Sequence, residues 1–269
     1  MPTTNERPRG RVLLATTDIP AEYHADRLRW WTINSPSWSK HIDADQNRGA
    51  LLVKLAQRAS ELVGAIECPV VADLGCGEGA FLRAFTRLVP DAVLHGIDFC
   101  PAMLAEANRR STGLNLAYAL GDLEQPGFTP PSRVDLVTSI LAMDEMDQLE
   151  PAFCNIAGTL APGGAAMLVV MDPLKEMERN QADLGACLNG NARLNDGVLL
   201  VKTFPTAVDM EPAAPYSRIV RPLARYTAAA IAAILQPELV EQLTHTVGIG
   251  SYSDTLLFDV LVFRKPTRR

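Results

Sequence analysis

Short apolar runs and longer amphipathic stretches alternate through the middle of the chain, and each run has the length of a strand. Runs such as VDLVTSI and AAMLVVM are apolar almost throughout, which indicates strands that are buried on both faces of a sheet. The strands predicted here cover 70–74, 92–97, 114–120, 134–139 and 165–171. The helices predicted between them cover 79–89, a stretch starting at Pro101, and 149–160. This alternation is typical of a doubly wound parallel sheet with helices on both faces.

The pattern is less regular at both ends of the chain. Residues 1–20 are expected to form a flexible arm, and two helices are predicted over 21–31 and 45–63, separated by a break at INSPSW. After Asp172 the regular alternation stops. The elements predicted in this later part are a helix over 174–188 and strands over 198–204, 217–220, 240–247 and 255–263.

Composition narrows the class of protein. The 269 residues are 48% hydrophobic and 21% charged, with a net charge of −6, which argues against a protein that binds mainly phosphate backbones. The five cysteines form no CxxC pair, so reduced thiols are expected and no metal site is predicted. No apolar run approaches the roughly 20 residues of a membrane span. We therefore expect a soluble cytoplasmic protein.

The stretch VVADLGCGEGAF carries the first chemical signal. A buried strand ends on Asp73 and is followed by glycines at 75, 77 and 79, directly before a predicted helix. Glycine permits positive φ and lets a ligand approach the backbone, while the helix N-terminus points at the same place. A tight structural turn is the alternative interpretation. The acids that follow decide between the two.

Two more acids end the next predicted strands, Asp98 in LHGIDF and Asp122 in YALGD. Because parallel strands end at one edge of the sheet, these carboxylates and Asp73 are expected to line one crevice. A carboxylate there accepts hydrogen bonds from ribose hydroxyls or from an amino group. A single aspartate at such a place is usually a cap, but three in register favour a ligand site.

The stretches VVADLGCGEG, HGIDFCPAML, YALGDLEQP, RVDLVTSILAMDEMDQLEPA and LAPGGAAMLVVMDP resemble, in order and spacing, the class I S-adenosylmethionine-dependent methyltransferases. The resemblance covers about residues 69–172. It implies a Rossmann-like, seven-stranded, mostly parallel α/β sheet whose last strand runs antiparallel. The acid before GxGxG distinguishes this pattern from the GxGxxG of dinucleotide sites. The division that follows is 1–20 flexible arm, 21–66 N-terminal helical lid, 67–172 cofactor-binding core, 173–221 inserted substrate cap and 222–269 C-terminal part of the core sheet.

The resemblance also implies roles for individual residues. Gly75 and Gly77, with Gly79 in the same turn, would lie against the methionine moiety of S-adenosylmethionine, and Asp73 would face its ammonium group. Leu141, or Ala142 beside it, would lie near the sulfonium. These residues form the methionine half of the expected cofactor site.

The other half of the expected cofactor site holds the adenosine. The resemblance implies that Asp98 holds the ribose and that Phe99 and Met103 flank the adenine. Asp122 would bind the adenine amino group, with the Leu123 backbone at the ring. Acidic contacts suit a ligand that carries a sulfonium and an ammonium and no phosphate.

Aromatic residues gather in EYHADRLRWWTINSPSWSKH, although the chain as a whole is poor in them. They are interpreted either as cover for the sheet edge or as a lid that binds the methyl acceptor by stacking or cation–π contact. The candidates are Tyr23, Trp30, Trp31 and Trp38 for acceptor binding, and His41 (or His24) as a base.

MDEMD places acids directly after the fourth core strand, where they can orient an amine or act as a base. Asp144, Glu145 and Asp147 can all take this role, and Asp144 and Glu145 are the candidates. The alternative is that these acids cap the next helix, which is the interpretation favoured for Asp147. Asp172, after the fifth strand, is expected either to face the acceptor or to cap a helix. SILAMD stands where many enzymes that methylate nucleic-acid amino groups have DPPY or NPPY, which favours a small acceptor.

The sequence therefore predicts an S-adenosylmethionine-dependent methyltransferase. It would transfer a methyl group in line to an N, O or C nucleophile of a small metabolite or natural product. RPLARYTAAAI resembles the segment before the sixth strand in small-molecule members of the family. The alternatives are methylation of tRNA or protein, and a non-catalytic partner protein with the same fold. A homodimer is compatible with the sequence.

Overall fold

The computed structural model describes residues 12–16, 19–126, 128, 133–173, 175, 199–203, 216–249 and 252–267. The helices are α1 (Tyr23–Ala44), α2 (Arg48–Val63), α3 (Ala80–Phe85), α4 (Pro101–Arg110), the 3₁₀ turn η1 (Met143–Glu145), α5 (Leu149–Thr159) and α8 (Leu223–Ala232). The strands are β1 (Val12–Thr16), β2 (Val70–Leu74), β3 (Val93–Asp98), β4 (Leu116–Leu120), β5 (Val134–Ile140), β6 (Leu160–Met171), β7 (Leu199–Thr203), β8 (Tyr216–Val220), β9 (Gln236–Ile249) and β10 (Tyr252–Arg264).

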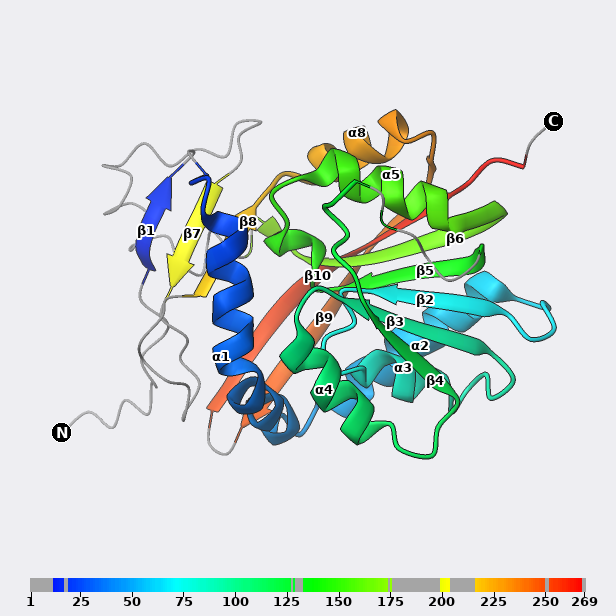
Figure 1. Cartoon of the computed structure of the whole chain (residues 1–269), viewed down its shortest axis with the longest axis horizontal. Helices are drawn as coiled ribbons and strands as arrows, with labels where there is room; N and C mark the ends of the chain where they lie inside the picture. The colour runs from blue at the N-terminus through cyan, green and yellow to red at the C-terminus, as the bar shows by residue number, and fades with distance from the viewer. Residues whose placement is uncertain are drawn as a thin grey trace.

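Seven strands form the main sheet, in the order β4-β3-β2-β5-β6-β10-β9 (Figure 1). Strands β2 to β6 run parallel, whereas β10 is antiparallel to both of its neighbours, β6 and β9. The winding reverses between β2 and β5, which places a crevice beyond the carboxyl ends of these strands. The predicted α/β fold, with a last strand that runs antiparallel, is confirmed.

Helices cover both faces of this sheet, as the near-continuous apolar strands predicted. Successive side chains of a strand point to opposite faces. Val71 packs in the cluster formed with α2 and α3, while Ala72 packs with α5 and α8. Val169 and Val170 of β6 divide in the same way. The two buried layers hold the carboxyl ends of the core strands in fixed register.

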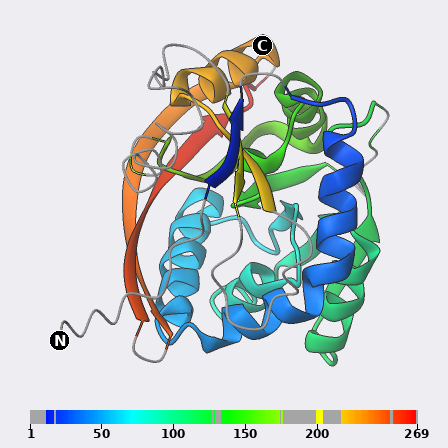
Figure 2. The ribbon, with the colours of Figure 1, turned by 90° about the vertical axis from the view of Figure 1, so that its left-hand side faces the viewer.

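A second, three-stranded sheet, β1-β7-β8, lies with α1 on the side where the parallel strands end (Figures 1 and 2). Strand β1 pairs antiparallel with β7, from Val12 opposite Thr203 to Thr16 opposite Leu200. The predicted flexible arm over 1–20 is therefore wrong for residues 12–16, which share a sheet with the predicted cap. Local sequence could not reveal this pairing, because the partner strand follows most of the core in the chain.

The predicted helix break at INSPSW is also wrong. Helix α1 continues from Tyr23 to Ala44 with Pro36 inside it. Asn34, Ser35 and Ser39 are buried around the proline, and the Asn34 side chain donates to the Trp30 carbonyl at 2.9 Å. Tertiary packing thus outweighs the local cost of proline in a helix. The helix predicted over 174–188 lies outside the described residues, apart from residue 175.

No helix in the described part of the chain is both long and apolar enough to cross a membrane.

Candidate active site

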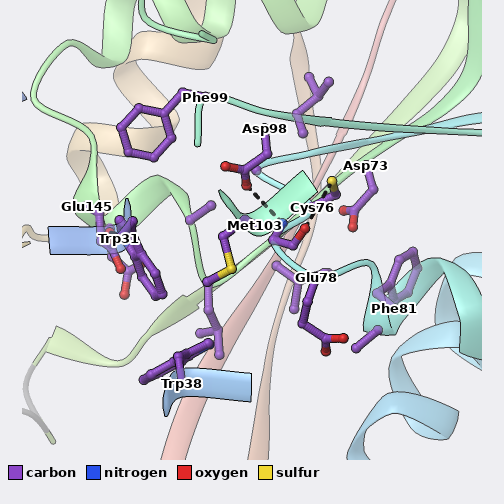
Figure 3. Close-up of a pocket in the computed structure, with 18 of the residues that line it drawn as sticks. Trp31, Trp38, Asp73, Cys76, Glu78, Phe81, Asp98, Phe99, Met103 and Glu145 are labelled. Carbon is purple, nitrogen blue, oxygen red and sulfur yellow. Dashed lines mark hydrogen bonds between the residues drawn. The ribbon is translucent and has the colours of Figure 1, made fainter. Parts of the chain in front are cut away.

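A cavity of about 400 Å³ opens beyond the carboxyl ends of the core strands, between them and α1 (Figure 3). Its size is that of a site for a small ligand. The sequence-predicted residues on its lining are Trp31, Trp38, Asp73, Gly75, Gly77, Asp98, Phe99, Met103, Asp122, Leu123, Leu141, Asp144 and Glu145.

The glycine turn after β2 forms the floor of the cavity. The N–H groups of Gly75 and Cys76 donate to the Ile97 carbonyl at 2.7 and 3.0 Å, which ties the turn to the end of β3. Gly75 has φ of +77°, and a Cβ there would lie 2.4 Å from the Ala142 Cβ. A Cβ on Gly77, by contrast, would meet nothing within 4 Å. The turn therefore keeps its backbone open to the cavity at Gly77.

Gly79 lies in the same turn but is not part of the cavity lining. Its φ is +78°, and a Cβ there would lie 2.1 Å from the Tyr118 hydroxyl oxygen. Gly96 on β3 makes room for the same ring, 2.4 Å from where its Cβ would stand. The structure thus gives Gly79 a packing role beside Tyr118, whereas the sequence grouped it with cofactor contacts.

Asp73 is the next-to-last residue of β2, and its carboxyl group is buried. The Thr138 hydroxyl of β5 donates to its Oδ1 at 2.7 Å. Burial raises the pKa of Asp73 to about 7, and the neighbouring charge of Asp98 adds to the rise. A cationic ligand beside Asp73 would favour the ionised carboxylate and so offset the unfavourable burial of its charge.

Asp98 ends β3 and is held by the backbone on both sides. Its Oδ2 accepts the Gly77 N–H at 2.8 Å, the contact drawn in Figure 3, and its Oδ1 accepts the Cys100 N–H at 2.9 Å. Burial raises the pKa of Asp98, while these N–H donors act in the opposite direction. Backbone N–H groups therefore fix the position of the Asp98 carboxylate.

Phe99, Met103, Asp122 and Leu123 line the end of the cavity near β3 and β4. Asp122 Oδ2 lies 2.6 Å from Nε2 of His24, and its Oδ1 accepts the Glu124 N–H at 3.0 Å. The first turns of α1 thus reach this end of the site, and His24 is not part of the cavity lining.

The sequence missed a buried ion pair between Arg27 and Glu124. Arg27 hydrogen-bonds the Glu124 carboxylate and donates to the Glu145 carbonyl at 2.6 Å. Glu124 Oε1 also accepts the N–H groups of Asp147 and Gln148 at 2.6 and 2.8 Å. Glu124 therefore holds the two residues before α5, whose N-cap is Gln148. The prediction that Asp147 caps this helix is wrong, because α5 has no side-chain cap hydrogen bond. The only sequence signal was an extra acid two positions after Asp122.

His24, Asp122 and Glu124 offer ligand atoms within 4.8 Å of one another. The carboxylate oxygens of Asp122 and Glu124 already accept hydrogen bonds from Arg27 and backbone N–H groups or contact the imidazole of His24. In the described residues these three side chains therefore fit an ion-pair network better than a metal site.

The aromatic residues of α1 divide into two groups. Trp31 and Trp38 line the cavity, with ring centroids 5.2 Å apart and planes at 88°. Tyr23 and Trp30 are buried away from the lining, and the Tyr23 hydroxyl donates to the Glu145 carbonyl at 2.7 Å. His41 lies on α1, but its side chain is outside the described part of the structure.

Asp144 and Glu145 form η1 at the end of β5 and are buried on the cavity lining. The Trp31 indole donates to Glu145 Oε2 at 2.7 Å, and Figure 3 shows the two side chains together, across the cavity from Asp73. Leu141, directly before η1, has φ of +57°, a strained value for leucine. The strained backbone of Leu141 and the two acids of η1 thus lie within five residues of one another at this edge of the sheet.

Arg221 and Asp172 are two further polar residues near these strand ends. Arg221 donates to the backbone carbonyls of Met146 and, at 3.2 Å, Asp147, which fixes the segment after η1. Asp172 is not part of the cavity lining. It accepts the Lys175 N–H at 2.6 Å and the Gln242 side chain at 3.0 Å. Of its two predicted roles, the structure therefore favours the local cap over contact with an acceptor.

Residues 71–164 match the family model described as "Methyltransferase domain". The chain is 34% identical over 121 residues to trans-aconitate 2-methyltransferase of Methylobacterium radiotolerans, which is 44% of this chain and 45% of that protein. It is 32% identical over 118 residues to malonyl-[acyl-carrier protein] O-methyltransferase of Halorhodospira halophila, which is 43% of this chain and 40% of that protein. The matched regions therefore span less than half the length of these curated relatives.

Solved structures extend the similarity over nearly the whole chain, as fold alone. The 1,6-didemethyltoxoflavin-N1-methyltransferase of Burkholderia thailandensis superposes with a TM-score of 0.62 over 96% of both chains, at 13% identity. An S-adenosylmethionine-dependent methyltransferase of Mesorhizobium loti superposes with a TM-score of 0.52 over 77% of this chain and 96% of that one, at 18% identity. The fold around the cavity is thus shared with these methyltransferases.

Proposed function

Because the chain contains a class I S-adenosylmethionine-dependent methyltransferase domain, we propose that it transfers the methyl group of this cofactor to a small metabolite or natural product. The acceptor nucleophile is an N, O or C atom. The observation that carries the proposal is the cavity, where the open glycine turn, buried strand-end acids and aromatic residues of α1 meet.

The residues present fit the cofactor. Gly77 leaves open space where a side chain would stand, and Asp73 and Asp98 are buried carboxylates that suit the ammonium and the ribose hydroxyls. Phe99 and Met103 offer apolar surface for the adenine, beside Asp122. When bound, S-adenosylmethionine supplies a sulfonium-activated methyl group that a nucleophile displaces in line.

The remaining lining would hold the acceptor. Trp31 and Trp38 provide an aromatic surface for a flat or apolar acceptor, and Met171 of β6 and Phe258 of β10 add further apolar surface to the lining. In model reactions, holding two reactants in the right geometry contributes up to about 7–11 kcal/mol. Positioning by these side chains, together with exclusion of water by α1, is therefore the main contribution proposed for the protein.

Glu145 and Asp144 are proposed to orient the acceptor or to take its proton. A protonated amine or a phenol has to lose a proton, which a nearby carboxylate can accept, whereas a carboxylic acid is already ionised at neutral pH and needs no base. The relatives named above act, by their names, on trans-aconitate and on malonyl-[acyl-carrier protein]. These names support small organic acids as the first acceptors to test, alongside flat heterocycles.

A binding and turnover experiment tests the proposal. Calorimetry of the full chain with S-adenosylmethionine and S-adenosylhomocysteine should give saturable binding, and incubation with labelled cofactor and a metabolite library should give a labelled product. Binding without any labelled small molecule, but with label on tRNA or protein, would favour the alternative acceptors. Absence of binding to both cofactor forms would leave only a non-catalytic role for this fold.

A further inference from the structure

The carboxylate of the cofactor's methionine moiety has no partner among the residues assigned so far. S-adenosylmethionine carries three charged groups, an ammonium, a sulfonium and a carboxylate, and the acids of the lining suit the two cationic groups but not the carboxylate. A buried carboxylate needs a cation or several N–H donors. The cations on the lining are Arg27, Arg48 and Arg218.

Two of these arginines lie beside other parts of the site. Arg27 is bound to the Glu124 carboxylate and the Glu145 carbonyl, and its guanidinium lies 4.7 Å from the centre of the Phe99 ring. Arg27 therefore lies at the end of the cavity that is predicted to hold the adenine. Arg218 comes from β8, a strand of the small sheet that contacts η1 on the proposed acceptor side.

Arg48, the first residue of α2, is the cation beside the glycine turn. Its Nη2 lies 3.7 Å from Oε1 of Glu78, the residue between Gly77 and Gly79. In the described part of the chain the Arg48 guanidinium makes no hydrogen bond, and Glu78 Oε1 is buried without a hydrogen-bond partner. The two groups are thus close enough to attract but not to bond.

The neighbouring arginines have closer partners. The Arg83 guanidinium donates to both the backbone carbonyl and the side-chain carboxylate of Glu78. Arg110 binds both oxygens of Asp43 at 2.8 Å and also bonds Glu106. Arg48 is therefore the arginine of this cluster whose donors are still available, and burial acts to lower its pKa against the charge of Glu78.

We propose that Arg48 binds the carboxylate of the methionine moiety of S-adenosylmethionine. The methionine tail would run along the open backbone at Gly77, with its ammonium toward Asp73 and its carboxylate toward α2. Arginine suits this role because its planar fork matches a carboxylate. The inference rests on the proposed function, since it assigns a group of that cofactor.

Binding measurements with two ligands test this assignment without turnover. S-adenosylhomocysteine keeps the carboxylate, and its decarboxylated analogue differs only in lacking it. For the unchanged chain we expect tighter binding of S-adenosylhomocysteine. Arg48→Gln should weaken that binding roughly 10- to 100-fold, as expected for loss of hydrogen bonds to a charged group, and leave the analogue unchanged.

Arg58→Gln is the matched control on the same helix, because Arg58 pairs with Glu61 and Glu241 away from the cavity. It should change neither affinity. Equal weakening of both ligands by Arg48→Gln, or no weakening, would overturn the assignment while leaving the proposed function in place. If Arg48→Gln unfolds, Arg48→Lys replaces it and should weaken only S-adenosylhomocysteine. If the unchanged chain binds neither ligand, the function and the assignment both fail.

Discussion

The indole N–H of Trp31 donates to the carboxylate of Glu145 at 2.7 Å, which joins the covering helix α1 to the edge of the sheet where the acceptor is proposed to lie. Trp31→Phe keeps an aromatic wall but removes this donor. A hydrogen bond to a charged group contributes about 1.5–3 kcal/mol. Once an acceptor is known, we expect kcat/KM for it to fall roughly tenfold or more, with the Kd of the cofactor almost unchanged.

Trp30→Phe is the control for this change, because Trp30 is buried on the same helix away from the cavity. It should lower the free energy of unfolding and leave kcat/KM for the acceptor nearly intact. Equal kinetic effects of the two substitutions would contradict a specific role for the Trp31–Glu145 contact.

Asp73 should make stability depend on pH. Its pKa is about 7 in the folded chain and near the ordinary 3.8 in the unfolded chain. Between these values the folded state keeps a proton that the unfolded state has released, so its contribution to the free energy of unfolding falls as pH rises. Above pH 7 this contribution is fully lost.

Urea unfolding of the cofactor-free chain and of Asp73→Asn, from pH 4.5 to 8, measures this contribution. The asparagine carbonyl can still accept from Thr138, so the difference between the two isolates the titration. We expect the unchanged chain to lose stability relative to Asp73→Asn as pH rises toward 7. Parallel pH profiles would refute the raised pKa.

Asp98→Ala should affect both binding and stability. It removes the acceptor of two backbone N–H groups, those of Gly77 and Cys100, and an unsatisfied buried donor costs about 1–3 kcal/mol. We therefore expect loss of S-adenosylhomocysteine binding together with a lower free energy of unfolding. Asp91→Ala, on an exposed turn, is the control and should change neither. Undiminished binding by Asp98→Ala would reject the proposed ribose contact.

Gly79→Ala should lower stability more than Gly113→Ala. Both glycines have positive φ, +78° and +83°, so both substitutions carry a backbone cost of about 1–2 kcal/mol. Only at Gly79 would the new Cβ clash, with the Tyr118 hydroxyl, whereas at Gly113 nothing lies within 4 Å. Urea unfolding of the two variants measures the difference, and adding Tyr118→Phe to Gly79→Ala should recover part of it. Equal losses would show that Tyr118 moves aside without cost.

The core sheet was predictable because its signals are local. Apolar runs marked the strands, and parallel strands end at one edge, so the positions of Asp73, Asp98 and Asp122 on one cavity followed from their places in the sequence. Glycines were harder to interpret. Their spacing marked the turn but did not distinguish the glycines within it. The structure does, because a Cβ on Gly79 would meet the Tyr118 ring whereas a Cβ on Gly77 would meet nothing within 4 Å.

The contacts of α1 were not predictable, since they depend on how a helix docks on residues far along the chain. Arg27 with Glu124, and His24 with Asp122, join segments about a hundred residues apart in sequence. No periodicity encodes such pairs. The continuation of α1 through Pro36 has the same origin, because burial of the flanking residues offsets an unfavourable local sequence.

The pairing of β1 with β7 has a consequence for the order of folding. The chain that joins these two strands contains every parallel strand of the main sheet, so their pairing closes a very long loop. Contacts of such high sequence separation form slowly, because loop-closure entropy is lost before the contact stabilises the chain. Core strands β2 to β6 are expected to assemble first and the small sheet last. During synthesis the nascent protein would then hold an assembled glycine turn before the small sheet beside it has formed.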